Sequence, residues 1–201
     1  MSKGLAIYGF GGHAREAAFQ MKHVIENEKL DLQFYVDDEY VNDIARPISE
    51  FNPEERTMMV AVADSKDRET MVKRLPKETE YFTFIHHAAI VFDLENIEIG
   101  EGSFIGAFSL ITTNIKIGKH AILNRGNHIG HDTLIGDYLS MMPGAIISGN
   151  VKAGECLYMG TNSSIREKIE ICNDVTVGLN SGVVKNIKEP GIYVGLPAKK
   201  L

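Results

Sequence analysis

The sequence predicts an α/β plus β protein: a Rossmann-like parallel α/β domain over residues 1–85, then a parallel β-helix of about five coils over residues 86–201. Two patterns support this prediction. Strand-like and helix-like segments alternate over the first 85 residues, and a six-residue repeat runs from Ile99 to Val183. Glycine is also in excess, at 19 of 201 residues against an average of roughly 7%. Eight of these glycines follow the repeat.

The first domain alternates apolar strand-like segments with amphipathic helical ones. The expected strands are residues 4–9, 32–36, 57–62 and 81–85, and the expected helices are residues 14–28 and 65–75. Strands that alternate with helices form a parallel sheet. The domain is smaller than a complete dinucleotide-binding domain, which needs two mononucleotide halves.

A tight glycine-rich loop separates the first strand from the first helix. Residues 9–14, GFGGHA, fit the pattern G-x-G-x-x-A, in which backbone N–H groups and the following helix N-terminus hold a phosphate. Asp37 lies 26 residues after Gly11, beyond the spacing of about 20 expected for an acid on a ribose hydroxyl. The residues leave three alternatives open: NAD, a nucleotide with another attachment, or a purely structural turn.

A step of six residues meets an apolar residue at all fifteen positions of the second domain. These positions are Ile99, Ile105, Ile111, Ile117, Leu123, Ile129, Ile135, Met141, Ile147, Ala153, Met159, Ile165, Ile171, Val177 and Val183. At 44% apolar content, the chance of fifteen such hits is about 5 in a million. A six-residue period matches a hexapeptide β-helix, in which three hexads close one coil.

Each hexad is expected to give one short strand and one corner. The aliphatic residue points inward, and the next residue, Gly at eight positions and Asn at 124, suits a corner that requires positive φ or a close backbone approach. No insertion interrupts the register, so no long loop is expected between Ile99 and Val183. The period does not give the hand of the coil, and the general rule for parallel crossovers is right-handed.

Composition excludes several classes of protein. The net charge of −6 disfavours nucleic acid as a partner. No apolar run approaches the length that spans a bilayer, and the N-terminus lacks a signal-type pattern, so we expect a cytoplasmic protein without a membrane partner. Cys156 and Cys172 form neither a disulfide framework nor a C-x-x-C pair. His86 and His87 are adjacent and His128 precedes His131 by three, but no further ligand completes a metal site, so we expect none.

Several motifs together resemble a known family along nearly the whole chain. They are IYGFGGHAREAA, VDDEY, IHHAAIV, the unbroken hexapeptides and GIYVGLPAKK. They resemble the acetyltransferases of nucleotide-linked amino sugars, which include the bacillosamine and perosamine N-acetyltransferases and, more distantly, the sialic acid O-acetyltransferases. The resemblance implies a left-handed β-helix, a homotrimer with active sites between neighbouring prisms, and acetyl-CoA as the acetyl donor.

The resemblance also implies the catalytic residues. The family's base is a His followed by an acid and an aliphatic-Gly corner, which matches His131 and Asp132 in HDTLIG. An imidazole with a pKa near 6.5 suits removal of a proton from the attacking amine, and Asp132 would orient the ring. By position, the backbone N–H of Gly149 would stabilise the oxyanion.

Further site residues are implied in the same way. For the nucleotide sugar they are Gly9, Gly11, Gly12, His13, Asp37, Asp38 and Asn124; for acetyl-CoA they are Gly149, Gly160, Asn162, Gly178, Pro197 and Lys199, with Lys200 as the alternative to Lys199. Asn124 fits equally a corner residue that tolerates positive φ. Ser140 stands where bacillosamine-type relatives often have a second His, which puts a second imidazole in doubt.

Three functions follow from these observations. The leading one is N-acetylation of a UDP-, dTDP- or GDP-linked 4-amino-4,6-dideoxy sugar for a surface glycan, such as O-antigen (lipopolysaccharide), capsule or glycoprotein. The second is O-acetylation of a sialic-acid-type sugar, with the same base acting on a hydroxyl. The third is a non-catalytic trimeric binding module, against which the His131–Asp132 pair counts. The sequence does not identify the nucleobase or the stereochemistry of the sugar.

Overall fold

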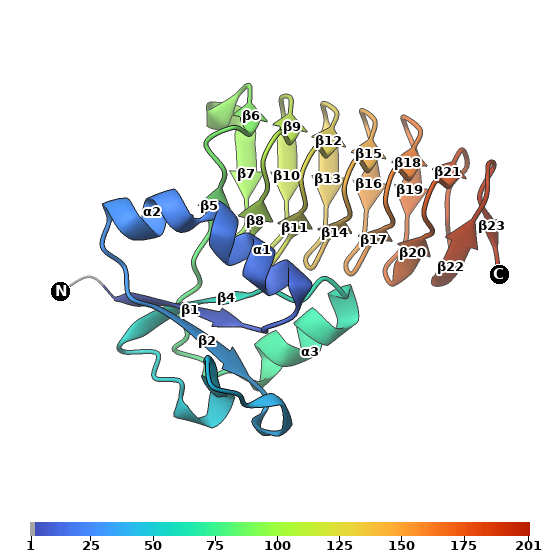
Figure 1. Cartoon of the computed structure of the whole chain (residues 1–201). Helices are drawn as coiled ribbons and strands as arrows, with labels where there is room; N and C mark the ends of the chain where they lie inside the picture. The colour runs from blue at the N-terminus through green and yellow to red at the C-terminus, as the bar shows by residue number, and fades with distance from the viewer. Residues whose placement is uncertain (1–2) are drawn as a thin grey trace.

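A computed structural model describes residues 3–201, in which an N-terminal α/β unit lies along the first coils of a long solenoid (Figure 1). The later coils extend beyond this unit and carry the C-terminus. No helix within residues 3–201 is long and apolar enough to cross a membrane.

The α/β unit is built on a parallel sheet with the strand order β3-β2-β1-β4. Its strands are β1 (Gly4–Tyr8), β2 (Leu32–Val36), β3 (Ala45–Pro47) and β4 (Arg56–Val60), its α-helices are α1 (Gly12–Gln20), α2 (Lys22–Asn27) and α3 (Ser65–Arg74), and its 3-10 helices are η1 (Asp38–Tyr40) and η2 (Ile48–Glu50). Both faces of the sheet are buried. One packs on α1 and on the solenoid residues Phe104 and Ile122, and the other packs beneath α3.

The expected elements differ from this sheet in two places. Residues 81–85 were expected as its fourth strand, but Tyr81 forms only an isolated bridge to Met58, and β5 (Phe84–Ile85) pairs within the solenoid. The fourth strand is β3, whose three residues Ala-Arg-Pro carry no strand signal. The helix expected at residues 14–28 is two helices that break at Met21, and it begins at Gly12, so Gly12 and His13 belong to the first helical turn rather than to the loop.

The solenoid is a triangular prism with three parallel faces. Face 1 contains β5, β8 (Phe104–Ile105), β11 (Ile122–Leu123), β14 (Ser140–Met141), β17 (Tyr158–Met159), β20 (Val175–Val177) and β22 (Gly191–Val194), with β23 (Lys199–Lys200) antiparallel at its end. Face 2 contains β6 (Ile90–Val91), β9 (Leu110–Ile111), β12 (His128–Ile129), β15 (Ile146–Ile147), β18 (Ser164–Ile165) and β21 (Gly182–Val183). Face 3 contains β7 (Ile97–Ile99), β10 (Ile115–Ile117), β13 (Thr133–Ile135), β16 (Lys152–Ala153) and β19 (Glu170–Ile171), and η3 (Leu94–Asn96) precedes β7.

The prism in residues 3–201 has about six turns rather than the expected five. Within the repeat, partner residues are 18 apart, as for Ile99 and Ile117. Before it, Val91 pairs with Ile111, 20 residues away, because two extra residues lie between β6 and β7. After it, Ile171 bridges to Ile187, 16 residues away. A strict step of six therefore loses the register at both ends while the coil continues.

The corners separate two roles that the sequence assigned to one position. The glycines after the inward aliphatic residues are needed for close approach of successive coils: a Cβ on Gly118 would lie 2.5 Å from the carbonyl carbon of Gly136. Positive φ belongs instead to the residue three positions after each inward aliphatic. The members of this set are Gly102, Phe108, Asn114, His120, Gly126, Asp132, Tyr138, Gly144, Asn150, Cys156, Asn162, Lys168, Asp174 and Asn180. Asn124 is outside the set, so the alternative that it is a positive-φ corner is wrong.

Candidate active site

His131 and Asp132 form the corner between face 2 and face 3, where β12 ends and β13 begins. The His131 Nδ1 atom lies 2.7 Å from the Asp132 Oδ2 atom. Asp132 occupies the left-handed region, with φ of 57°, which its short polar side chain tolerates. Both side chains are exposed, at 57% and 45%, so the pair is accessible to a substrate.

The Asp132 carboxylate is held by two donors. Asn114, one coil earlier on the same corner, donates its Nδ2–H to Oδ1 over 2.6 Å. The hydrogen bonds from Asn114 and then His131 hold the pKa of Asp132 below its usual value. Because an ionised carboxylate only accepts hydrogen bonds, Nδ1 of His131 carries the proton, and Nε2 keeps a free lone pair.

The next coil places Gly149 against the ring of His131. A Cβ on Gly149 would lie 2.7 Å from Nε2 and 2.8 Å from Cε1. Gly149 is buried, and none of the hydrogen bonds found in the described residues uses its N–H. A backbone donor without an internal partner therefore adjoins an imidazole nitrogen suited to act as a base.

A second candidate site lies at the carboxyl ends of β1 and β2, where parallel sheets commonly bind ligands. A cavity of about 400 Å³ is lined there by Gly9, Gly11, Asp37 and aromatic side chains that include Tyr40. Gly9 has φ of +119°, and a Cβ on Gly11 would meet no atom within 4 Å. The backbone of the glycine loop is therefore open to a ligand. Asp37 and Asp38 also line an adjoining cavity of about 440 Å³.

Tyr8, Asp37 and Arg74 connect these two cavities. The Tyr8 hydroxyl donates to Asp37 Oδ1 over 2.5 Å, and Arg74 contacts both carboxylate oxygens at 3.2 and 3.3 Å. Burial, and then the hydrogen bond to Asp37, raise the pKa of Tyr8. The Asp37 carboxylate is thus held in one orientation at the edge of the cavity.

His13 faces the prism rather than the cavity. Its ring packs edge-on against Phe104 on face 1, with 5.6 Å between ring centroids. Neither ring nitrogen has a hydrogen-bond partner among the described residues. Burial, and then the charge of Arg68, lower the pKa of His13 to about 4. Gly12 precedes it in the first turn of α1, so these two residues lie at the seam between α1 and the solenoid.

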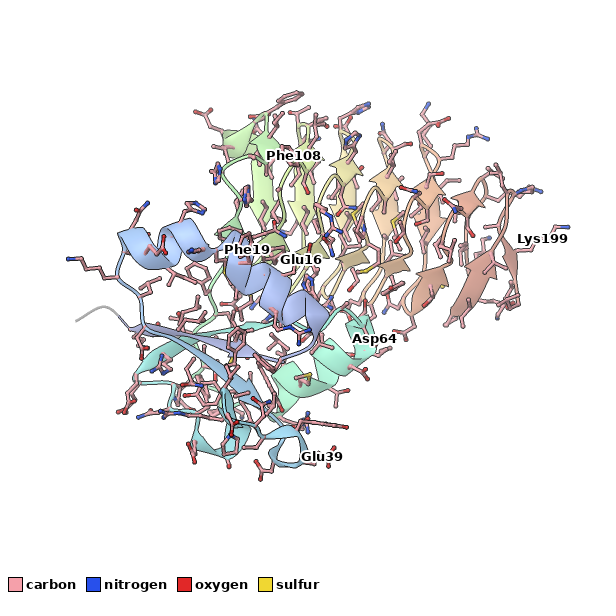
Figure 2. All side chains as sticks on the ribbon, in the orientation of Figure 1. Glu16, Phe19, Glu39, Asp64, Phe108 and Lys199 are labelled. Atoms are coloured by element: carbon pink, nitrogen blue, oxygen red, sulfur yellow. The ribbon has the colours of Figure 1, made fainter. Side chains whose placement is uncertain are left out.

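The residues expected to bind acetyl-CoA do not form one site within the chain. Gly160, Asn162 and Gly178 lie at the corner between face 1 and face 2, whereas Gly149 lies between face 2 and face 3. Pro197 and Lys199 belong to the terminal segment, and Lys199 lies at the end of the solenoid far from Glu39 of the α/β unit (Figure 2).

Asn124 shares the corner between face 1 and face 2. It is buried, and its Oδ1 atom accepts a hydrogen bond from the backbone N–H of Arg125 over 2.8 Å. Arg125 forms an ion pair with Glu16 of α1. Asn124 is therefore close to the α/β unit and not to His131.

The two candidate sites are on opposite sides of one chain. The α/β unit covers face 1: α3 reaches the corner between face 3 and face 1 through Arg68, and α1 reaches the corner between face 1 and face 2 through Gln20, which binds the Ala107 amide. His131 lies at the third corner, which face 1 does not border. A ligand at the glycine loop therefore does not reach His131 of the same chain.

Two residues that the sequence did not indicate join the α/β unit to the prism. Arg68 is fully buried and donates to the carbonyl oxygens of His120, Tyr138 and Leu139, and to Ser140 Oγ. Ser140, where relatives have a second His, also bonds to Ser65 and to the Ala63 carbonyl. Arg68 lies in a charged helix and gives no sequence signal that separates it from a surface residue.

A hexapeptide β-helix with an exposed histidine–carboxylate pair at one corner defines the class of hexapeptide-repeat acyltransferases. No family model matches the sequence. The solved structures similar to this chain include WeeI from Acinetobacter baumannii AYE, with 27% identity over 100% of both chains and a TM-score of 0.88. They also include the perosamine N-acetyltransferase from Caulobacter crescentus, a mutant form solved with CoA and GDP-perosamine, with 22% identity over 100% of this chain and 98% of that chain and a TM-score of 0.85.

The acetyltransferase domain of PglB from Neisseria gonorrhoeae FA1090, in complex with acetyl coenzyme A, is also similar, with 24% identity over 100% of both chains and a TM-score of 0.69. The resemblance to hexapeptide-repeat sugar acetyltransferases is thus confirmed over the full length of the chain.

Proposed function

We propose that this protein transfers an acetyl group from acetyl-CoA to the amino group of a UDP-, dTDP- or GDP-linked 4-amino-4,6-dideoxy sugar. The observation that carries the proposal is the corner at which the His131–Asp132 pair adjoins the unpaired N–H of Gly149. Similar chains solved with CoA, acetyl-CoA and GDP-perosamine support it. The product would serve a surface glycan such as O-antigen, capsule or glycoprotein, made in the cytoplasm.

In this proposal Nε2 of His131 removes the proton from the sugar amine as the nitrogen attacks the thioester carbon. Asp132 stabilises the imidazolium that forms. The Gly149 N–H donates to the carbonyl oxygen as it becomes negative. Collapse of the tetrahedral adduct breaks the C–S bond, and the proton held by His131 goes to the departing CoA thiolate. No metal is required for any of these steps.

The proposal places the sugar nucleotide on the Rossmann-like domain of residues 1–85. The residues for it are Gly9, Gly11, Gly12, His13, Asp37, Asp38 and Asn124. The cavity at the carboxyl ends of β1 and β2 supports this placement, with the pyrophosphate near the N-terminus of α1. Acetyl-CoA would lie along residues 86–201, the left-handed prism, on Gly149, Gly160, Asn162, Gly178, Pro197 and Lys199.

The separation of the two half-sites favours a homotrimer in which each active site combines two chains. Face 2 suits the interface, because Ile90 and Ile146 project from it with exposed fractions of 50% and 40%. Face 3 instead presents ion pairs such as Glu98 with Lys116. The glycine loop of one chain would then deliver its sugar to His131 of a neighbour.

Acetyl transfer by the wild type and by His131→Ala tests the activity. The acceptors are UDP-, dTDP- and GDP-linked 4-amino-4,6-dideoxy sugars, together with free and CMP-linked sialic acid. We expect turnover of a nucleotide-linked amine and a loss of roughly 10² to 10⁴ in the variant, with CoA binding retained. Turnover of sialic acid alone would replace the amine with a hydroxyl acceptor, and a fully active His131→Ala would remove His131 as the base.

Mixed trimers test the shared site. His131→Ala chains lack the base, and Asp37→Ala chains are altered only in the α/β unit. If each site combines two chains, subunits mixed after mild dissociation regain activity that neither variant has alone. Sites contained within single chains would give no such complementation.

A further inference from the structure

Asn114 occupies the position directly above Asp132 on the corner between face 2 and face 3. The two residues are 18 apart, which is one coil, and both have positive φ, 53° and 57°. Their side chains are joined by the hydrogen bond of 2.6 Å from Asn114 Nδ2 to Asp132 Oδ1. The two Asp132 oxygens therefore have different partners, Asn114 on one and His131 on the other.

This contact differs from other polar contacts between coils. Asp137 Oδ1 accepts from the Lys119 backbone N–H, and Asn173 Oδ1 accepts from the Glu155 backbone N–H. Those side chains tie one coil to the next. The coils at Asp132 are already tied by its own N–H, which donates to the Thr113 carbonyl. The Asn114 amide instead holds a side chain in place.

We infer that Asn114 is a positioning residue for the acetyl transfer, acting on His131 through Asp132. The inference rests on the proposed function, in which His131 is the base. With Oδ1 bound to Asn114, the carboxylate cannot rotate away from the ring, and Oδ2 stays on Nδ1. The ring is thereby kept as the Nδ1–H tautomer, with the Nε2 lone pair available to the amine.

The first test is Asn114→Gly, because glycine adopts positive φ without strain. We expect kcat to fall about tenfold with KM for both substrates unchanged. Nitrogen-15 NMR of His131 should show a smaller fraction of the Nδ1–H tautomer, a readout that needs no substrate. Asn180→Gly is the matched control, since Asn180 has φ of 51° at another corner. Wild-type kcat and tautomer in Asn114→Gly would overturn the inference.

A double-mutant cycle separates positioning from a structural role. In an Asp132→Gly background, Asn114→Gly should cause no further loss of kcat, because its only route to the base is gone. An undiminished tenfold loss in that background would show that Asn114 does not act through Asp132. His131→Ala serves as the reference: if that variant is fully active, the proposed function fails, whatever the result at Asn114.

Asn114→Asp provides an independent check. A carboxyl at 114 donates to Asp132 only while the two acids share a proton, so ionisation of both removes the hydrogen bond and adds repulsion. The ratio of variant to wild-type kcat should therefore rise as pH is lowered. A ratio that does not change with pH would contradict the inference.

Discussion

The His131 ring lies directly against the α-carbon of Gly149, with Nε2 only 2.7 Å from where a Cβ on that glycine would be. The backbone of Gly149 is outside the positive-φ set, so alanine is strained by the ring alone. The ring is exposed and moves away at little cost to the fold. We predict that Gly149→Ala lowers acetyl transfer at least tenfold while Tm changes by no more than about 1 °C. Enzyme assay and thermal unfolding check this, and full activity would show that the ring position is not critical.

Gly118→Ala is expected to give the opposite result. A Cβ there would lie 2.5 Å from the Gly136 carbonyl carbon and 2.6 Å from the Asp137 amide nitrogen, and backbone does not yield as a side chain does. Overpacking of this kind costs about 1–3 kcal/mol, or several degrees in Tm. Gly118 is on the corner between face 3 and face 1, away from His131. Thermal unfolding should show the loss, and an unchanged Tm would contradict the close approach of the coils.

The contrast between these glycines shows how far the sequence predicts the fold. The six-residue period placed every inward residue from Ile99 to Val183, because interior packing demands an aliphatic side chain at each. Positive φ was assigned to the wrong position, because the residues that adopt it have no common chemistry: Phe108, His120 and Lys168 take it as readily as Asn114. There the stacked coils impose the conformation, whatever the side chain prefers.

Arg68→Met should weaken the joint between the α/β unit and the prism. The guanidinium satisfies carbonyl oxygens from both parts, and each buried acceptor left unpaired costs about 1–3 kcal/mol. We predict a decrease in Tm of about 10 °C, followed by calorimetry at a fixed protein concentration. Ser140→Ala, which removes one hydroxyl from the same network, should lower Tm by a smaller amount. An Arg68→Met protein with wild-type Tm would contradict this role.

Arg68 and Asn114 also show why part of the site escaped the sequence. His131, Asp132 and Gly149 follow a motif within the repeat, so their spacing alone brings them together. Arg68 acts through residues more than 50 positions away, and Asn114 looks like any other corner asparagine. Their partners depend on how the α/β unit docks and on which coil stacks above Asp132, which local patterns do not contain.

His120 links the fold to pH. Its ring is buried between Tyr81 and Tyr138, and burial, followed by the charge of Arg68, lowers its pKa to about 4. Lys119 acts in the same direction, while Glu101 and Asp137 oppose it. Because the unfolded state, with a pKa near 6.5, binds the proton first, stability is full above pH 6.5 and is lost as pH falls toward 4. His13, also lowered to about 4, adds to the same loss.

We therefore predict that the wild type loses about 1–2 kcal/mol of stability per buried histidine between pH 7 and pH 5. His120→Asn removes one titrating group and keeps a residue that tolerates the φ of 55° found there. Its Tm at pH 7 should be lower than that of the wild type, because the buried amide packs less well, but its further fall on acidification should be smaller. Adding His13→Asn should flatten the profile again. Thermal unfolding at a fixed protein concentration measures these slopes, and equal slopes in the wild type and both variants would show that the two imidazoles do not become protonated on unfolding.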